Sequence, residues 1–261
     1  MSDRLAEVEG VMIDLDGVLY VEDEAISGAV GAVAELRRRE LVLRFATNTT
    51  SRPRRQIHAR LQRLGFDVEL DEIVTPAALA VRRCEERGHR GVALLMGDAV
   101  KEDFAGLRED DGRIDAVIVG DLGDAFGHQV LNRAFRHVMD GAELIALQKN
   151  RYWLTPSGLS LDVGPYVAAL EFAASVEALV VGKPAHAFFA SALDGMRVPA
   201  ERAAMVGDDV ESDIGGALAA GLAGILVRTG KYREDAVQRS GVVPTAVVDS
   251  IADVPRLLGG A

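Results

Sequence analysis

A short apolar run near the start of the chain ends in two aspartates and a glycine, and this stretch strongly restricts the possible folds. Residues 11–17 read VMIDLDG, which is typical of a buried strand that delivers Asp14 and Asp16 at its end. A carboxylate at the rim of a core is costly unless a cation or hydrogen-bond donors compensate it. Residues two apart on an extended chain point to the same side, so both carboxylates can address one centre. A hard divalent cation such as Mg²⁺ suits such a pair.

Strand-like and helix-like segments alternate in the first and last parts of the chain. After the opening strand, the pattern predicts a helix over 29–40, a strand over 41–46 and a helix over 53–64. From residue 178 the alternation resumes. Strands are expected at 179–181, 203–206 and 223–227, helices over 185–196 and 212–220, and a short strand followed by a helix within 246–258. This order is typical of a parallel sheet with right-handed crossovers. The sequence therefore predicts an α/β fold with a doubly wound parallel sheet.

The middle third of the chain has an α/β pattern of its own. Helices are expected over 77–87, 130–139 and 167–174, and strands over 92–96, 116–119 and 144–147. No Gly/Ser-rich linker marks the edges of this part, so its limits follow from where the motifs of the outer parts stop. We predict a discontinuous core domain, residues 1–74 and 179–261, with an α/β domain, residues 75–178, inserted into it.

Composition excludes several classes of function. Hydrophobic residues make up 49% of the 261 residues, which is ample for a core, and the net charge of −11 argues against a nucleic-acid-binding surface. A single cysteine, Cys84, allows no intrachain disulfide or cysteine-based zinc cluster. The first ten residues, MSDRLAEVEG, lack the basic and apolar blocks of a secretion signal, and no apolar run approaches about 18 residues. We expect a cytoplasmic protein with no membrane or nucleic-acid partner. A small phosphorylated substrate stays compatible, because one metal ion and one lysine can reverse the charge locally.

Polar side chains directly follow four of the predicted strands in the outer parts. In open parallel sheets, ligands bind in the crevice beyond the carboxyl ends of the strands. Each set alone has an ordinary explanation as a turn, a helix cap or a solvated loop charge. Four sets with complementary chemistry on one edge instead predict a site. Its members are Asp14 with Asp16, Thr47 with Asn48, Lys183 after Gly182, and Asp208 with Asp209 after Gly207.

These four sets resemble the motifs of the haloacid-dehalogenase superfamily of phosphohydrolases. The matching phrases are DLDGVLY, the strand-terminal TN, VGKP, and GDD followed by Asp213. The long insertion resembles the type-two cap of NagD-like and pyridoxal-phosphate phosphatases. The phrases KNRYW, LSLDVGPYVAALEFA and GILVRTGKY resemble the branch that contains phospholysine phosphohistidine inorganic pyrophosphatases and their hydrolase-domain-containing relatives. The resemblance implies a Rossmann-like core with an α/β cap, a small phosphorylated substrate, Mg²⁺ as cofactor and a homodimer through the cap.

The resemblance also implies how the two aspartates of the first strand divide the chemistry. Asp14 would be the nucleophile that forms an aspartyl-phosphate, which splits one difficult step into two. Asp16 would protonate the leaving oxygen and later take a proton from the hydrolytic water. Mg²⁺ would be held by the Asp14 carboxylate, the main-chain carbonyl of Asp16 and the Asp208 carboxylate.

The remaining motif residues would bind the phosphoryl group or support those that do. Thr47 and Asn48 would donate hydrogen bonds to phosphoryl oxygens, and Lys183 would neutralise charge on the phosphoryl group and on Asp14. Asp213 is expected as an acceptor for Lys183 or for a metal-bound water. Asp209 is expected to act similarly, with helix capping as the alternative.

Substrate specificity must come from outside these motifs, since they recognise only a phosphoryl group. In the inserted domain we select Asn150, Asp162 and Gly164, which lie in polar segments that lead back towards the core domain. An acidic residue at position 162 would favour a cationic leaving group. Asp162 can equally cap the helix that starts near Pro165.

The favoured function is a Mg²⁺-dependent phosphatase acting on a small phosphorylated metabolite through an aspartyl-phosphate. The first alternative uses the same core on a P–N or P–O–P bond, as a phosphoramide or inorganic pyrophosphate hydrolase. A receiver-type phospho-aspartate signalling protein is a different class, and Asp16 argues against it because an acid–base group would speed loss of the signal. A catalytically inactive binding protein is disfavoured because all the core chemical groups are present.

Overall fold

The computed structural model describes residues 3–109, 112–155 and 158–259, and these form two compact units. The first unit contains the described residues up to Thr47, Arg55–Val74 and those from Lys183 onward, and the second contains Asn48–Arg54 and Thr75–Gly182. Residues 48–54 and 179–182, which the sequence analysis places in the core domain, thus pack with the second unit. Three of the four crossings between the units follow sheet strands, and the fourth lies at Arg54, where α3 (Arg54–Arg63) begins.

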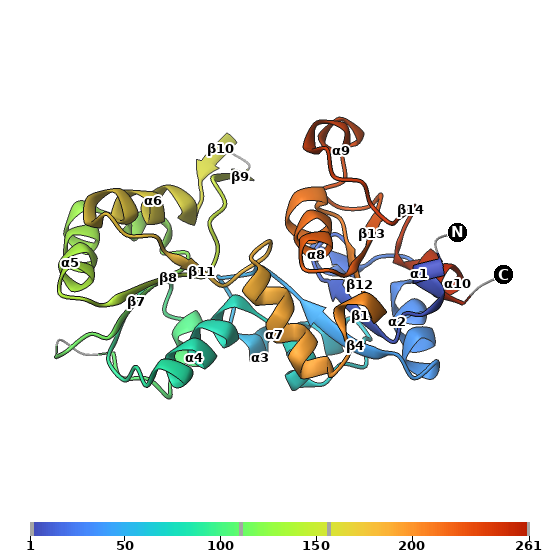
Figure 1. The fold of residues 1–261 in the computed structure, drawn as a ribbon, viewed down its shortest axis with the longest axis horizontal. Coiled ribbons are helices and arrows are strands. Elements are labelled where there is room, and N and C mark those ends of the chain that lie inside the picture. Colours follow the sequence, from blue (N-terminus) through green and yellow to red (C-terminus); the bar gives the residue numbers. More distant parts are fainter. Residues whose placement is uncertain (1–2, 110–111, 156–157, 260–261) are drawn as a thin grey trace. The chain divides into compact units, whose positions relative to one another are not determined.

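A six-stranded parallel sheet forms the centre of the first unit (Figure 1). Its first strand along the chain, β1, is fully buried and pairs with β12 on one side and β4 on the other. A strand covered on both faces reads as a continuous apolar run, which is why its position is visible in the sequence. In sheet order the strands are β14 (Ala246–Val248), β13 (Ala223–Val227), β12 (Ala203–Gly207), β1 (Gly10–Asp14), β4 (Val42–Ala46) and β5 (Ile73–Val74).

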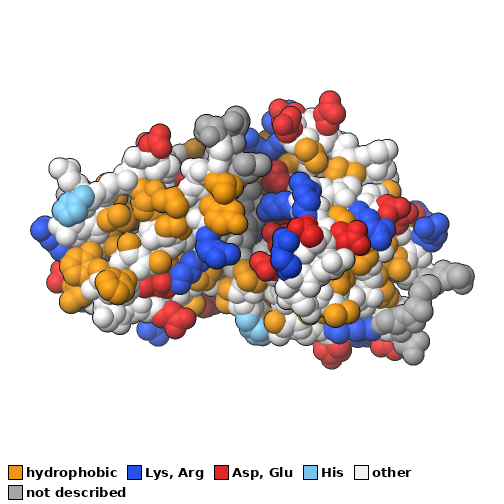
Figure 2. Space-filling view, turned by 90° about the horizontal axis from the view of Figure 1, so that it is seen from above, with side chains coloured by type: hydrophobic (Ala, Val, Ile, Leu, Met, Phe, Trp, Pro, Cys, Tyr) orange, Lys and Arg blue, Asp and Glu red, His pale blue; other side chains and the backbone are white. Residues whose placement is uncertain are grey.

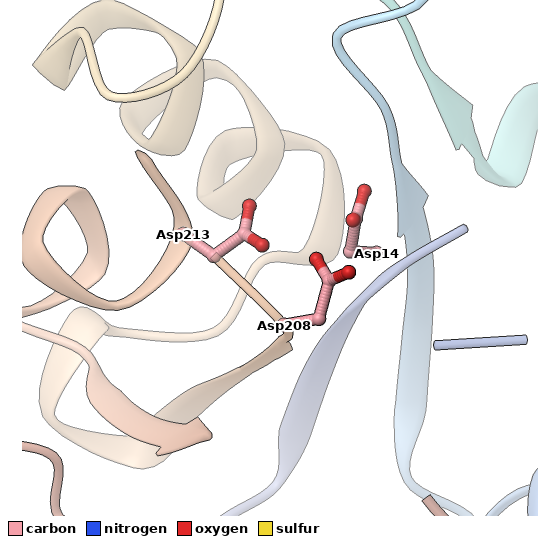
Figure 3. Close-up of side chains that lie close together, drawn as sticks. All are labelled: Asp14, Asp208 and Asp213. Atoms are coloured by element: carbon pink, nitrogen blue, oxygen red, sulfur yellow. The ribbon is translucent and has the colours of Figure 1, made fainter. Parts of the chain in front are cut away.

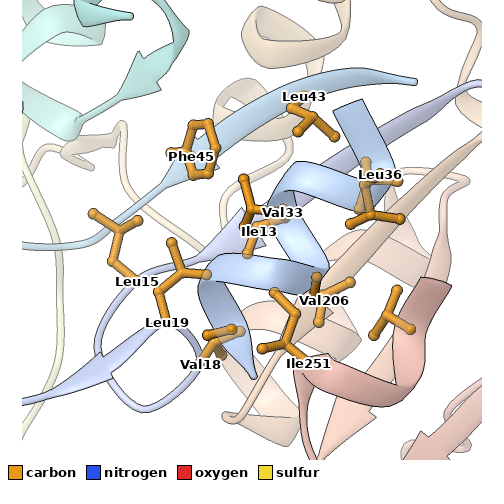
Figure 4. Packing of buried hydrophobic residues seen from close by; sticks show 14 of the residues in the cluster. Ile13, Leu15, Val18, Leu19, Val33, Leu36, Leu43, Phe45, Val206 and Ile251 are labelled. Carbon is orange, nitrogen blue, oxygen red and sulfur yellow. The ribbon is translucent and has the colours of Figure 1, made fainter. Parts of the chain in front are cut away.

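Helices cover both faces of this sheet, and alternate residues of β1 identify which helix packs where. Val11 and Ile13 belong to the main core. Figure 4 shows Ile13 beside Val33 and Leu36 of one helix. Gly10 points to the opposite face, where an added Cβ would meet Met196. Residues of α2 (Ala29–Arg38), α3 (Arg54–Arg63) and α10 (Val254–Leu258) are among those that form the main core. The doubly wound α/β fold predicted from the sequence is confirmed.

Shorter elements complete the first unit. The predicted helix over 212–220 is instead a π-helical turn, η5 (Val210–Gly215), followed by one α-helical turn. The others are α1 (Asp3–Ala6), the two-stranded pair β2 (Tyr20–Val21) and β3 (Glu24–Ala25), η1 (Leu70–Glu72), α7 (His186–Met196), η4 (Ala200–Arg202), α8 (Gly216–Ala219), α9 (Glu234–Ser240) and η6 (Ile251–Asp253).

The second unit is built on its own four-stranded parallel sheet. Its core joins Val117 and Leu144 from the strands to Val138 and Val167 from the helices. Thr75 caps the first helix, Pro76 opens it and Gly88 ends it at φ 70°, as helix-end chemistry predicts. In sheet order the strands are β11 (Leu179–Val180), β8 (Glu143–Ala146), β7 (Ala116–Val119) and β6 (Val92–Leu95), and the helices are α4 (Pro76–Arg87), η2 (Val100–Phe104), η3 (Gly123–Ala125), α5 (His128–Met139) and α6 (Val163–Ala174).

The sequence analysis did not predict the antiparallel pairing of β9 (Tyr152–Thr155) with β10 (Gly158–Leu161) in this unit. Its apolar residues Leu159 and Leu161 are exposed, so their pattern does not report a buried face. Among the described residues, no helix is both long and apolar enough to span a membrane.

Candidate active site

Three carboxylates gather beyond the ends of two neighbouring strands of the first unit (Figure 3). Asp14 is the last residue of β1, Asp208 directly follows β12, and Asp213 comes from η5. One carboxylate oxygen from each lies within 4.8 Å of the others. The side chains of Asp208 and Asp213 are each 1% exposed. Because β1 and β12 are parallel neighbours, their carboxyl ends bring these residues together.

One buried lysine lies among these carboxylates. The Nζ atom of Lys183 is 2.7 Å from Asp14 Oδ1 and 2.7 Å from Asp213 Oδ1. It also donates to the main-chain oxygen of Ala46 at 3.2 Å. Burial by itself lowers the pKa of Lys183, but the two carboxylates outweigh it and raise this pKa above the ordinary lysine value. Lys183 therefore stays charged and connects Asp14, at the end of β1, with Asp213 in η5.

The cluster has more carboxylates than buried cations, and its pKa values follow from that. Burial raises the pKa of Asp208 to about 7, and the charge of Asp14 adds to this effect. The pKa of Asp213 is also raised, by burial and by Asp14, against the opposing effect of Lys183. Asp208 Oδ1 is buried and has no hydrogen-bond partner among the described residues. Buried, unpartnered carboxylate oxygens are suitable ligands for a hard divalent cation, so these residues fit a metal ion.

Asp16 does not share this environment. The strand ends at Asp14, and the chain turns at Gly17 with φ 85°, so the extended geometry that would align Asp14 and Asp16 does not continue. The Asp16 side chain is exposed and accepts a hydrogen bond from the hydroxyl of Tyr20 at 3.3 Å. Burial and the nearby Asp16 raise the pKa of Tyr20, so its hydroxyl keeps the proton. The sequence analysis did not identify Tyr20.

Thr47 and Asn48 follow β4 but belong to different units. Thr47 is 2% exposed, and its N–H donates to the main-chain oxygen of Val74 at 3.1 Å. Asn48 is half-buried within the second unit. There, a Cβ on Gly182 would lie 2.9 Å from Asn48 Oδ1, so a glycine at position 182 allows this amide to approach the chain.

A segment after β13, which the sequence analysis did not select, holds Asp208 in place. The hydroxyl of Thr229 donates to the main-chain oxygen of Gly17 at 2.5 Å. The main-chain N–H of Lys231 donates to Asp208 Oδ2 at 2.7 Å. Gly17 and Gly230 both have positive φ, and a Cβ on either would overlap this same oxygen. The rule that polar residues after a strand form the site also applies to β13 and would have found this segment.

Asp209 caps the π-helical turn, which was the alternative given for it. Its Oδ1 accepts from the N–H groups of Glu211 at 3.1 Å and Ser212 at 3.0 Å. Its Oδ2 lies 3.8 Å from Lys231 Nζ. Desolvation works to lower the pKa of Lys231, but the surrounding carboxylates, with Asp209 foremost, raise it above the ordinary value.

The three residues selected in the inserted domain meet around one loop of the second unit. Asp162 caps α6 by accepting from Val163 N–H at 2.7 Å, and the same oxygen accepts from Gln148 Nε2 at 2.6 Å. Gly164 donates its N–H to the main-chain oxygen of Asn150 at 2.9 Å, and a Cβ there would lie 2.5 Å from that oxygen. The Asn150 side chain is exposed. Gln148 is buried at the centre of these bonds, and no signal in the sequence marks it.

Comparison with known proteins identifies the family. A model of haloacid dehalogenase-like hydrolases matches residues 11–108, and a related HAD-hydrolase-like model matches residues 180–254. The human phospholysine phosphohistidine inorganic pyrophosphate phosphatase is 42% identical over 98% of this chain and 96% of its own length. The chain belongs to the haloacid dehalogenase-like hydrolases. Human haloacid dehalogenase-like hydrolase domain-containing protein 2 is likewise 42% identical, over 93% of each chain.

Solved structures of the same family have the same fold over nearly the whole chain. A 4-nitrophenylphosphatase from Thermotoga maritima matches with a TM-score of 0.89 at 26% identity, over 97% of this chain and 98% of the other. NagD from E. coli K-12 matches with a TM-score of 0.84 at 25% identity, over 94% and 98%. The family, its NagD-like branch and the fold predicted from the sequence are thereby confirmed, and this haloacid dehalogenase-like hydrolase is a phosphatase.

Proposed function

We propose that this hydrolase is a Mg²⁺-dependent phosphatase that hydrolyses a small phosphorylated metabolite through an aspartyl-phosphate on Asp14. The observation that carries the proposal is the buried carboxylate cluster, in which Asp14 is paired with Lys183 at 2.7 Å and Asp208 has a buried oxygen without a partner among the described residues. A phosphoryl dianion is repelled by carboxylates, so such a cluster serves phosphoryl transfer only when cations accompany it.

In the first half-reaction, an Asp14 oxygen attacks phosphorus while the bond from phosphorus to the leaving oxygen breaks. Lys183 holds Asp14 in position, because it pairs with Asp14 and with Asp213 at 2.7 Å each. Asp16, exposed beside the cluster, gives its proton to the leaving oxygen. Thr47 and Asn48 donate hydrogen bonds to the phosphoryl oxygens.

In the second half-reaction, water attacks the same phosphorus and the bond to the Asp14 oxygen breaks. Asp16, now a carboxylate, takes the proton from that water and returns to its starting state. The sum is hydrolysis of one phosphoester to an alcohol and orthophosphate, with Asp14 regenerated. Tyr20 holds the Asp16 carboxylate by its hydrogen bond at 3.3 Å.

The Asp14 and Asp208 carboxylates and the main-chain carbonyl of Asp16 would hold the metal ion, with Asp213 placed to support the site through Lys183. Mg²⁺ bound there supplies positive charge that screens the phosphoryl oxygens from the carboxylates. The Lys231 N–H occupies Asp208 Oδ2, which leaves Oδ1 for the metal.

The first unit would be the catalytic core domain and the second unit the cap domain, which selects the substrate. Asn150, Asp162 and Gly164 remain our candidates for that selection. Asp162 Oδ1 is engaged with Val163 and Gln148, so its charge would act on a leaving group mainly from a distance. Gly164 would serve by allowing the loop at 148–151 to lie against α6.

Cleavage of a phosphoramide or of inorganic pyrophosphate is the second candidate function. The observation that favours it is the 42% identity, over 98% of the chain, to a relative named for phospholysine, phosphohistidine and inorganic pyrophosphate. The core chemistry is the same for both candidates, and only the atom that leaves phosphorus differs.

We also propose a homodimer through the cap domain. Large apolar side chains are exposed on the second unit, and Figure 2 shows hydrophobic side chains gathered over it on the visible face. Exposed patches of this kind often mark protein interfaces. Light scattering would report a mass of twice 27.8 kDa for the dimer, and a mass of 27.8 kDa contradicts it.

Hydrolysis of para-nitrophenyl phosphate with and without Mg²⁺ tests the proposed function. Turnover that requires Mg²⁺ and is lost in Asp14→Asn is expected. The Asp16→Asn variant should lose turnover of poor leaving groups far more than of activated ones, because only the former need a proton. No turnover by the wild type on this substrate or on a panel of phosphorylated metabolites would contradict the proposal.

A further inference from the structure

Lys231 is an exposed cation anchored beside the carboxylate cluster. Its main-chain N–H is bound to Asp208 Oδ2 at 2.7 Å, and the preceding Gly230 lies against Gly17. The start of the side chain is therefore fixed next to the site. The side chain itself is 68% exposed, and its Nζ lies 3.8 Å from Asp209 Oδ2. A rigid backbone thus presents an accessible ammonium group at the rim of the cluster.

The other lysine of the site cannot serve a charge that lies farther out in the substrate. Lys183 is 3% exposed and contacts Asp14, Asp213 and the main-chain oxygen of Ala46. Its ammonium group is engaged by two carboxylates and one main-chain carbonyl. Lys183 is thus committed to the nucleophile and its surroundings. A second negative group on the substrate needs another cation.

The contact between Lys231 and Asp209 is weak enough to be replaced. At 3.8 Å it is longer than a hydrogen bond, and exposed ion pairs of this kind contribute little. Asp209 Oδ1 is occupied by the N–H groups of Glu211 and Ser212, so Asp209 keeps its position when Lys231 turns away. A phosphate group would offer Lys231 short charge-assisted hydrogen bonds instead.

We propose that Lys231 determines specificity by binding a negatively charged leaving group, so that the site favours phosphoanhydrides over monoesters with uncharged leaving groups. This inference rests on the proposed function and names the substrate class of the same site. With inorganic pyrophosphate, the Asp14 oxygen bonds to one phosphorus while the bridging oxygen leaves with the other phosphoryl group and takes the proton from Asp16. Lys231 holds the departing phosphoryl group, and water then releases the first one from Asp14 as a second orthophosphate.

The test compares pyrophosphate with phenyl phosphate in three variants at fixed excess Mg²⁺. Lys231→Met removes the charge but keeps the N–H that orients Asp208, and Lys231→Arg keeps the charge. Arg228→Met is the matched control, since Arg228 follows the same strand, is also exposed and pairs with Asp249 at 2.8 Å. The ratio of kcat/KM for pyrophosphate to kcat/KM for phenyl phosphate should fall about 10- to 100-fold in Lys231→Met. It should stay within about 3-fold in Lys231→Arg and in Arg228→Met.

Calorimetric binding of methylenediphosphonate and methylphosphonate gives a readout without turnover. Lys231→Met should weaken only the diphosphonate, by a similar factor. An unchanged ratio of kcat/KM in Lys231→Met would overturn the inference. So would a wild type that neither binds the diphosphonate more tightly than methylphosphonate nor cleaves pyrophosphate. In either case, hydrolysis of phenyl phosphate would still support the proposed function. If Lys231→Met selectively lost diphosphonate binding but the wild type showed no turnover, the binding role of Lys231 would be supported and the proposed function overturned.

Discussion

Two groups of charged side chains, one in each unit, contain carboxylates whose pKa values shift in opposite directions. In the first unit, Asp14, Asp208 and Asp213 surround one buried cation, Lys183, and the pKa of Asp208 is raised to about 7. In the second unit, Glu143 alone receives Arg83 at 2.5 Å and His89 at 2.8 Å. Burial raises the pKa of Glu143, but the hydrogen bonds from Arg83 and His89 outweigh it and bring the pKa below its usual range.

The difference lies in how fully each group compensates its own charge. Both oxygens of Glu143 accept hydrogen bonds from Arg83 or His89, so its charge is balanced and the group contributes to stability. The cluster around Asp14 has an excess of negative charge and a buried oxygen on Asp208 that has no partner among the described residues. Such a group costs stability unless something else binds to it, which is the behaviour expected of a metal and substrate site. Substitutions that change the charge balance should therefore affect the stability of the two units differently.

Removing the buried cation should have the largest effect. Lys183→Met leaves the three carboxylates without compensation, and we expect the free energy of unfolding in EDTA at pH 8 to fall by about 3–5 kcal/mol. Lys149→Met is the control, because Lys149 pairs with Glu171 at 2.7 Å but is exposed, and its loss should cost less than about 1 kcal/mol. Urea denaturation measures both. Equal losses in the two variants would show that the carboxylate cluster does not carry an excess of negative charge that depends on Lys183.

Neutralising one carboxylate in each unit should change stability with opposite sign. Asp208→Asn keeps an acceptor for the Lys231 N–H but removes a buried charge, so the metal-free protein should gain about 2 kcal/mol at pH 8. Glu143→Gln removes the charge that Arg83 and His89 bind and should lose about 1 kcal/mol. The same urea experiment in EDTA measures the pair. A loss of stability in Asp208→Asn would contradict the comparison.

The pH dependence of stability should differ in the same way, with smaller effects. The pKa of Asp208 is raised in the folded state, so the folded protein binds a proton that the unfolded chain releases, and its contribution to stability is lost as pH rises from about 4 to about 7. The pKa of Glu143 is lowered, so its contribution is present above the ordinary glutamate value of 4.5 and is lost as pH falls below it.

Unfolding in EDTA at a series of pH values, with each amide variant as reference, separates the two contributions. Subtracting Asp208→Asn should remove the decline towards pH 7, and subtracting Glu143→Gln should remove part of the acid decline. Parallel pH profiles for the wild type and Asp208→Asn would contradict the assigned pKa shift.

Much of this arrangement is predictable from the sequence because buried parallel strands are readable as apolar runs. The strands β1, β4 and β12 lie where those runs predict, and parallel pairing then brings Asp14, Thr47 and Asp208 to one edge of the sheet. Helix ends with Thr75 or Gly88 follow equally from local chemistry. These features depend on residues close together in the chain.

Features that depend on contacts between distant segments were not predictable. The path of the chain after Asp14 exposes Asp16, which the alternation of an extended strand does not reveal. The N–H of Lys231 meets Asp208 only because β13 pairs with β12. Gln148 is recognisable as a centre of its loop only once α6 is folded against it. Likewise, a pKa shift depends on burial, and burial cannot be predicted from a sequence motif.

The stabilisation that Mg²⁺ gives to the folded protein tests most directly whether the excess negative charge around Asp14, Asp208 and Asp213 is a metal site. We predict that Mg²⁺ raises the free energy of unfolding of the wild type and of Glu143→Gln equally, by about 2.7 kcal/mol at a concentration one hundred times the dissociation constant. Asp208→Asn should show little or none of this increase at the same concentration. An equal increase in Asp208→Asn would contradict the account, because the cluster at the end of β1 and β12 would then not be where the metal binds.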